Sequence, residues 1–330
     1  MVSKLTVRLA AVTFVVIAGG LISAATASRA ASQTAPLTSE ERRVYRKAHT
    51  VIEWTSKEIA ENDSLGGLQP AANQDDLPAI LQEAGEQVAL FVEQFPNCAA
   101  KESIDWKVED PAYPAAYNRQ FRFLLAHPTA GGGKEIGESR TEADGSEINY
   151  KTSAGANFLT LGFARSELFL DPSKQATSQF RYLGRLKLGN READVVGFAQ
   201  VPEKGFVFAS YQEGKKSSAL FFQGLVWIDT RTHVILRIQT YLLAPPPGKR
   251  LVAQDTQIVF GPIQFSGGRE VFMLPVLVVV DTWRTTDIEA PVSNSHDASV
   301  SVGLEVGGAD SRKVDLRTHC HSIHTYSEYK

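Results

Sequence analysis

The chain of 330 residues has few cysteines and none of the common catalytic motifs. Its two cysteines, Cys98 and Cys320, exclude a disulfide-rich scaffold; whether they form one bridge depends on geometry that the sequence does not show. No GxSxG, HExxH or strand-linked GxGxxG pattern is present, and the GGGK stretch at 131–134 lacks the spacing of a phosphate-binding loop. We therefore predict a protein that is not an enzyme and uses no cofactor.

An excess of charge of one sign is also lacking. The formal net charge is −3, and acidic and basic residues are interspersed along the chain. Proteins that bind phosphate backbones normally carry a basic stripe, so nucleic acid is not an expected partner. Hydrophobic residues make up 43% of the chain, which is enough to build the core of a folded domain.

Long hydrophobic runs are absent except near the N-terminus. Lys4 and Arg8 flank the start of an apolar run at 9–22, and Ala25 and Ala27 follow it in the small-x-small pattern of a signal-peptidase site. We predict a signal peptide at 1–27, a linker at 28–37, and export to the periplasm or the extracellular medium. The alternative is an uncleaved anchor formed by the same run. No later run is long enough to cross a bilayer, so the mature chain is expected to have no transmembrane span.

Helical signals are concentrated in residues 38–110, the predicted helical N-terminal region. Thr38 and Glu41 form a capping-box pattern, which begins a helix expected to extend to about residue 62. A second helix is expected at 76–95, where Asp76 is the N-cap, Pro78 lies in the first turn and apolar residues recur at helical spacing.

Residues 111–330 have the pattern of strands. Apolar and polar residues alternate with period two in short segments, such as 180–188 and 233–243, and Gly-, Pro- or Lys-rich turns separate these segments. This spacing favours an antiparallel meander over alternating strands and helices. A Ser-, Gly- and Asp-rich stretch at 287–312 is predicted to be a loop insertion, and the predicted fold class is α+β.

Three segments resemble the strands of lipoprotein carriers of the LolA/LolB type: GLVWIDTRTHVILRIQTYLL (224–243), FMLPVLVVVDTW (272–283) and HTYSEY (324–329). With LPAILQEAGEQVALFVEQFPN (77–97), the chain also resembles a group of uncharacterised exported bacterial proteins. The resemblance implies a strongly curved antiparallel half-barrel with the N-terminal helices on its concave side. It also implies binding of a hydrophobic or lipid-like ligand, or of an envelope protein, without catalysis. A structural envelope module that contacts another protein through its helices is a further alternative.

Apolar strand residues are candidates for the ligand-binding face. Their alternation places them on one side of the sheet, where they would line either a ligand cavity or a closed core. These residues are Phe180, Tyr182, Val226, Ile228, Leu236 and Ile238.

Acidic residues in the strands could in principle form an acid–base pair. The candidates are Asp194, Asp229, Asp255 and Asp281. Asp229 ends a strand at the start of a tight turn, where an aspartate commonly accepts hydrogen bonds from its own backbone. We therefore predict a turn role for Asp229.

The stretch HCHSIH at 319–324 is the densest group of metal-ligating side chains. Residues i and i+2 of a strand share a face, so His319 and His321 form a two-histidine half-site, while Cys320 and His324 lie on the other face. A third ligand would have to come from elsewhere in the chain. The candidates are His233 and His296. A metal-dependent hydrolase is thus an alternative function.

Overall fold

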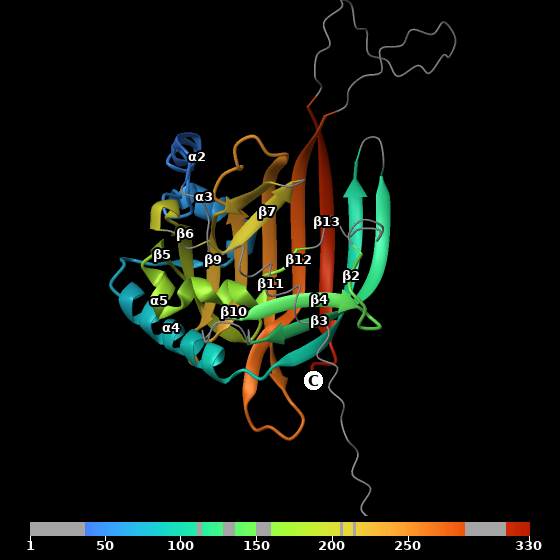
Figure 1. Cartoon of the computed structure of the whole chain (residues 1–330). Helices are drawn as coiled ribbons and strands as arrows, with labels where there is room; N and C mark the ends of the chain where they lie inside the picture. Colours follow the sequence, from blue (N-terminus) through green and yellow to red (C-terminus); the bar gives the residue numbers. More distant parts are fainter. Residues whose placement is uncertain are drawn as a thin grey trace, which may run out of the picture.

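The computed structural model describes residues 37–110, 114–127, 136–149, 160–204, 207–213, 216–287 and 315–330 (Figure 1). The predicted signal peptide lies outside these residues, as do nearly all of the linker and of the loop insertion. Among the described residues, no helix is long and apolar enough to cross a membrane.

The helices follow the capping signals of the sequence. α2 spans Ser39–Tyr45, and the predicted capping box is present: the Thr38 hydroxyl accepts from the Glu41 backbone N–H. The single helix predicted for 38–62 was wrong, because a second capping box at Thr55 and Glu58 begins a separate helix, α3 (Ser56–Glu61). The 3₁₀ helix η1 (Asp63–Leu65) follows, and α4 (Leu77–Gln94) confirms the second prediction.

An antiparallel sheet of 11 strands, in the order β1-β5-β6-β9-β10-β11-β12-β13-β2-β3-β4, forms most of the described structure (Figure 1). Its strands are β1 (Gln69–Pro70), β2 (Cys98–Glu109), β3 (Ala115–Ala126), β4 (Gly137–Glu142), β5 (Ser178–Leu188), β6 (Arg191–Gln200), β9 (Phe222–Asp229), β10 (Ile235–Leu242), β11 (Leu251–Gln264), β12 (Val271–Asp287) and β13 (Asp315–Ser327). A separate hairpin joins β7 (Ala209–Glu213) to β8 (Lys216–Leu220). The short segments between strands are α5 (Pro172–Gln175) and the 3₁₀ helices η3 (Ala164–Leu170) and η4 (Pro202–Lys204).

Two expectations about the sheet need correction. The sheet is open, since β1 and β4 are its two edges. It is also not strongly curled, so the strong curvature implied by the resemblance is not seen. Residues 98–109, placed by the sequence in the helical region, form β2 in the interior of the sheet, between β13 and β3. The alternation of buried Ile104, Trp106 and Val108 with exposed residues is the strand signal in this segment.

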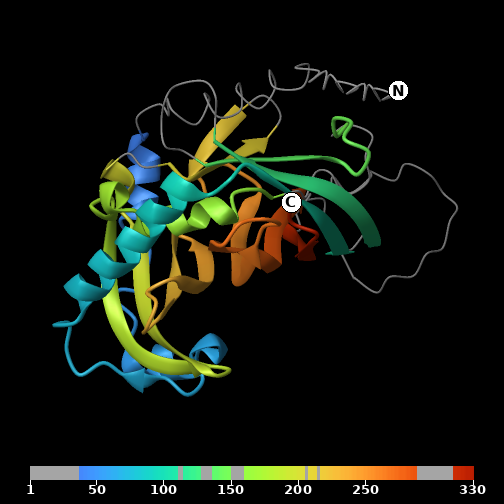
Figure 2. The ribbon, with the colours of Figure 1, turned by 90° about the horizontal axis from the view of Figure 1, so that it is seen from below.

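One face of the sheet, called the inner face below, packs against α4 and η3 (Figures 1 and 2). The main core cluster unites apolar residues of α4, of η3 and of strands from β2 to β13. A smaller apolar cluster on the same face contains Ile104, Trp106, Phe121 and Cys320. The opposite, outer face carries a third cluster around Trp227, which the segment near Leu65 covers.

Candidate functional site

The histidines of the HCHSIH stretch separate between the two faces, as strand periodicity predicts. His319 and His321 lie on the outer face, where both rings approach the same oxygen of Asp281 on β12. His319 Nε2 is 2.7 Å and His321 Nδ1 is 2.9 Å from Asp281 Oδ1. Trp283 stacks on the His319 ring at a centroid distance of 4.8 Å, and Glu109 lies 3.2 Å from its Nδ1. The side chains of this group are therefore hydrogen-bonding partners of one another.

The third metal ligands suggested by the sequence do not join this group. His233 pairs with Glu83 of α4 at 3.1 Å, and His296 lies outside the described residues. Across the described ranges, no group of three or more His, Cys, Asp or Glu side chains could hold a metal ion. The two-histidine half-site is thus a hydrogen-bonded surface cluster in this structure.

The two cysteines are free and buried. Cys320 pairs in register with Val108 of β2, and Cys98 begins the same strand. Ten residues of strand separate Val108 from Cys98, which corresponds to roughly 34 Å. A disulfide requires Cα atoms less than about 7 Å apart, so the bridge left open by the sequence does not form.

Asp255 pairs in register with Asp281 on the outer face, beside the histidine cluster. Burial, together with the charge of Asp281, raises the pKa of Asp255 to about 6 against the opposing hydrogen bonds from Gln239. Between about pH 4 and pH 6, the folded state therefore binds a proton that the unfolded state does not, and stability rises as the pH falls through this window.

We predict that Asp255→Asn raises the free energy of unfolding at pH 7 by about 1–2 kcal/mol, after discounting for partial exposure. The reason is that an amide avoids the cost of burying the charge and still accepts a hydrogen bond from Gln239. Urea unfolding at pH 5 and pH 7 checks this. The gain in stability should be smaller at pH 5, where Asp255 is largely protonated in the folded state. An equal gain at both pH values would show that the charge of Asp255 is not its cause.

Asp229 takes the predicted turn role. Its Oδ1 accepts hydrogen bonds from the backbone N–H groups of Arg231 and Thr232, at 3.0 and 2.9 Å, and from the Thr232 hydroxyl. These bonds keep the pKa of Asp229 low despite its burial. The residue fixes the β9–β10 connection, which places β10 beside β9 in the middle of the sheet.

The candidate lining residues lie in β5, β9 and β10, and five of the six belong to the inner face. Tyr182, Val226, Ile228 and Ile238 are part of the main core cluster, and Phe180 packs against it. Leu236 was misplaced: it packs on the outer face with Trp227. The cause is a register shift between Ile235 and Arg237, which puts Ile235 on the inner face and breaks the simple alternation.

The space between the inner face and α4 is filled by residues 160–170, called the plug below. The plug consists of η3 and the four residues before it, and it belongs to no strand. Phe163, Phe169 and Leu170 are at most 2% exposed and lie in the main core cluster. The Phe169 ring packs on Phe198 of β6 at 4.5 Å. Packed side chains of the plug therefore fill this space, and displacing the plug would make room for an apolar molecule.

Side chains of β4 hold the start of the plug. Glu138 accepts three backbone hydrogen bonds, from Gly162 at 2.8 Å, Phe163 at 3.0 Å and Arg165 at 2.8 Å. Burial raises the pKa of Glu138 against the lowering effect of these three donors. Two residues further along β4, Arg140 Nη1 donates to the Thr160 carbonyl at 3.1 Å.

The plug also buries one poorly satisfied acid. Glu167 in η3 is 4% exposed, and its Oε1 has no hydrogen-bond partner. Burial raises the pKa of Glu167 well above its usual value, which favours the neutral acid. A buried, unsatisfied carboxyl oxygen costs about 1–3 kcal/mol, so the plug is seated at some energetic cost.

A buried polar belt lies on the inner face between the two apolar clusters. It consists of Glu102 (β2), Arg140 (β4), His324 and Tyr326 (β13), which are at most 7% exposed. Arg140 forms a bidentate pair with Glu102 through Nε and Nη2. His324 Nδ1 donates to Glu102 at 2.9 Å, and the Tyr326 hydroxyl donates at 2.8 Å.

The charges of this polar belt cancel. Burial would raise the pKa of Glu102, but Arg140 and the hydrogen bonds from its neighbours hold it well below the usual range. Burial lowers the pKa of His324, which favours a neutral ring at pH 7, and burial with the adjacent Glu102 charge raises the pKa of Tyr326. One carboxylate thus faces one guanidinium in a neutral site.

Sequence reasoning missed the polar belt, although β2 carried a signal for it. Glu102 falls in phase with Ala100, Ile104 and Trp106, which are buried. A charged residue at an apolar position of a strand usually has a buried partner. The alternation could thus have identified Glu102, whereas its partner Arg140 lies 38 residues away on an edge strand.

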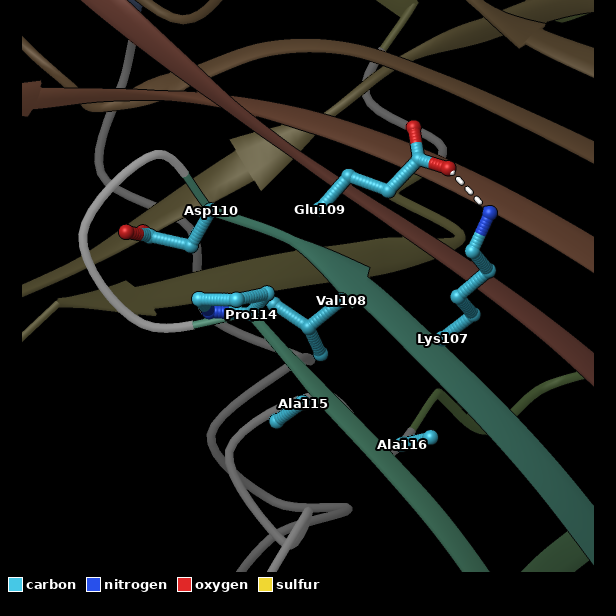
Figure 3. A pocket seen from close by; sticks show the side chains of 7 residues that line it. All are labelled: Lys107, Val108, Glu109, Asp110, Pro114, Ala115 and Ala116. Carbon is cyan, nitrogen blue, oxygen red and sulfur yellow. Dashed lines mark hydrogen bonds and ion pairs between the residues drawn. The ribbon is translucent and has the colours of Figure 1, made fainter.

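A surface hollow lies at the far end of the β2–β3 hairpin, with a volume of about 670 Å³ (Figure 3). Val108, Ala115 and Ala116 form part of its wall, and the Lys107–Glu109 ion pair lies at its rim. The hollow is wide open to solvent and lacks convergent polar groups. It is therefore a weaker candidate site than the interior.

Comparisons with known proteins give distant structural matches. No family model and no curated protein matches the sequence. Among solved structures, the chain is similar to a protein from Vibrio parahaemolyticus assigned as an outer membrane lipoprotein-sorting domain, with 10% identity and a TM-score of 0.35 over 76% of this chain and 91% of that one. A DUF1329 family protein from Desulfovibrio piger shares 9% identity, with a TM-score of 0.38 over 78% and 93%. The resemblance found in the sequence thus recurs here, but at these values it does not extend to ligands or residues.

Proposed function

We propose that this chain is an exported, non-enzymatic binding or carrier protein for a hydrophobic, lipid-like ligand. The ligand would lie between the inner face and α4, in the space that the plug fills, with Tyr182, Val226, Ile228 and Ile238 in its wall. The observation that carries this proposal is that a segment outside the sheet, and not the sheet itself, supplies the apolar side chains that close the interior.

Burial of an acyl chain would contribute about as much free energy as burial of the apolar side chains of the plug. Full burial of the Phe163, Leu168, Phe169 and Leu170 side chains contributes roughly 6–12 kcal/mol. A buried acyl chain contributes about 0.8 kcal/mol per methylene, so a chain of a dozen carbons contributes roughly as much. The plug also carries the cost of Glu167. A lipid-like ligand could therefore offset the apolar burial that is lost when the plug is displaced.

Native mass spectrometry of the protein purified from its own envelope is the direct test. We expect an apolar molecule to co-purify, and N-phenyl-1-naphthylamine, a fluorescent apolar probe, to bind the delipidated protein. A protein that carries no such molecule and does not bind the probe would rule the carrier function out.

We predict that Glu138→Gln loosens the plug. An amide has one acceptor oxygen where three backbone N–H groups now donate to two oxygens, and a buried donor left unsatisfied costs about 1–3 kcal/mol. Hydrogen exchange in residues 160–170 should accelerate at least about tenfold, and the naphthylamine probe should bind about five- to tenfold more tightly, since more molecules are open.

The matched control is Glu86→Gln, which removes an exposed carboxylate from α4 and should change neither measurement. Faster exchange in Glu138→Gln without tighter probe binding would mean that the space under the plug does not take apolar molecules.

A further inference from the structure

The position of the polar belt adds a requirement on any ligand that replaces the plug. The main core cluster lies on one side of the polar belt, and the smaller cluster around Trp106 lies on the other. The plug covers this belt directly: the Phe163 ring lies 5.1 Å from the His324 ring, and the Thr160 carbonyl meets Arg140. A molecule in the place of the plug would thus meet apolar side chains along its length and polar groups at one point.

When the plug is displaced, Arg140 loses one of its hydrogen-bond acceptors. Nε and Nη2 donate to Glu102, which sits beside Arg140 independently of the plug. Nη1 donates to the Thr160 carbonyl, which belongs to the plug. Displacing the plug removes this acceptor from a guanidinium that is fully buried, and an unmet donor of a charged group costs more than the 1–3 kcal/mol of a neutral one.

The charge of the polar belt limits which acceptor can replace the carbonyl. Glu102 already neutralises Arg140, and the His324 ring is neutral. A ligand carboxylate would bring an unpaired negative charge into the interior beside the Glu102 carboxylate, which repels it. An uncharged carbonyl oxygen, in contrast, reproduces what Thr160 supplies.

From this geometry we infer that the ligand is a neutral acyl ester, with its chain in the space of the plug and its ester carbonyl accepting the hydrogen bond from Arg140 Nη1. This inference rests on the proposed function and specifies its ligand class. Free fatty acids and plain hydrocarbons bind more weakly, because the first add charge and the second leave Arg140 without an acceptor.

Displacement of N-phenyl-1-naphthylamine from the wild-type protein by three molecules of equal chain length tests this. Methyl laurate, laurate at pH 8 and 1-dodecene present an ester, a carboxylate and no oxygen. We expect methyl laurate to displace the probe at a concentration at least about tenfold lower than either of the others, which corresponds to about 1.4 kcal/mol.

The double variant Glu102→Gln/Arg140→Met should lose the preference for the ester. It removes the donor and its counter-charge together, and the amide oxygen introduced at position 102 would still accept from His324 and Tyr326. The matched control Arg119→Met/Glu142→Gln removes a half-buried Arg–Glu pair between β3 and β4 and should keep the preference. Circular dichroism verifies that both variants fold.

The outcomes separate the two ideas. Equal displacement by all three molecules, or an ester preference that survives in the double variant, would overturn the ester assignment and leave the carrier function standing. Tightest binding of laurate would overturn it in favour of an anionic ligand. If neither the probe nor any of the three molecules binds, the carrier function fails as well.

Discussion

Replacing Arg140 by methionine is expected to lower the free energy of unfolding by about 3–5 kcal/mol, the largest effect of any single charged residue that we predict. The Glu102 carboxylate is fully buried, and Arg140 is its only partner of opposite charge among the residues that the structure describes. Without Arg140, Glu102 must stay charged without compensation or take up a proton. Urea unfolding of the variant at pH 7 measures the loss.

The double variant Glu102→Gln/Arg140→Met distinguishes a lost charge pair from a lost side-chain contact. With both charges removed, at least about 2 kcal/mol of the loss should return, because a buried ion pair replaced as a whole costs far less than one that is broken. A double variant that is no more stable than Arg140→Met would show that packing of the arginine side chain causes the loss.

Replacing Phe169 by alanine is expected to lower the free energy of unfolding by about 3–5 kcal/mol, the usual range for a fully buried phenylalanine. Its ring is 1% exposed and lies 4.5 Å from Phe198 and 4.7 Å from Phe208, so truncation leaves an apolar cavity beneath the plug. Thermal unfolding with and without saturating methyl laurate measures both the loss and its recovery.

Ligand should restore part of the stability of Phe169→Ala, since a molecule that binds only the folded state stabilises it by mass action. Phe221→Ala is the matched control, because Phe221 is similarly buried but lies in a separate apolar cluster with Tyr45 and Leu243, away from the plug. We expect a similar loss in this variant with a smaller recovery. Equal recovery in both variants would place ligand binding outside the space of the plug.

Much of the local structure could be predicted from short stretches of sequence. The capping box at Thr38 and Glu41, the first turn of α4 at Pro78 and the turn role of Asp229 all depend on residues within three or four positions of one another. The separation of His319 and His321 from His324 follows equally from alternation along one strand. Such features are local because each hydrogen bond or face depends on near neighbours.

The errors arose where a distant contact or an irregularity overrode the local pattern. The register shift after Ile235 moved Leu236 to the outer face, and no residue at 235–237 is typical of a β-bulge. β2 was missed because it follows a helix and contains several charged residues, yet β13 and β3 both pair with it. Tertiary pairing decides such segments, since strand preference depends on context more than helix preference does.

By itself, the sequence determined that the chain builds an antiparallel sheet with helices before it, and which side chains share a face where a strand is regular. Only the tertiary structure decided what covers those faces. The plug seals the inner face, Glu102 meets Arg140 across β3, and Asp281 lies between two histidines of the next strand. The physical reason is that alternation fixes the direction of a side chain, whereas its partner depends on strand order and on loops that close over long separations in sequence.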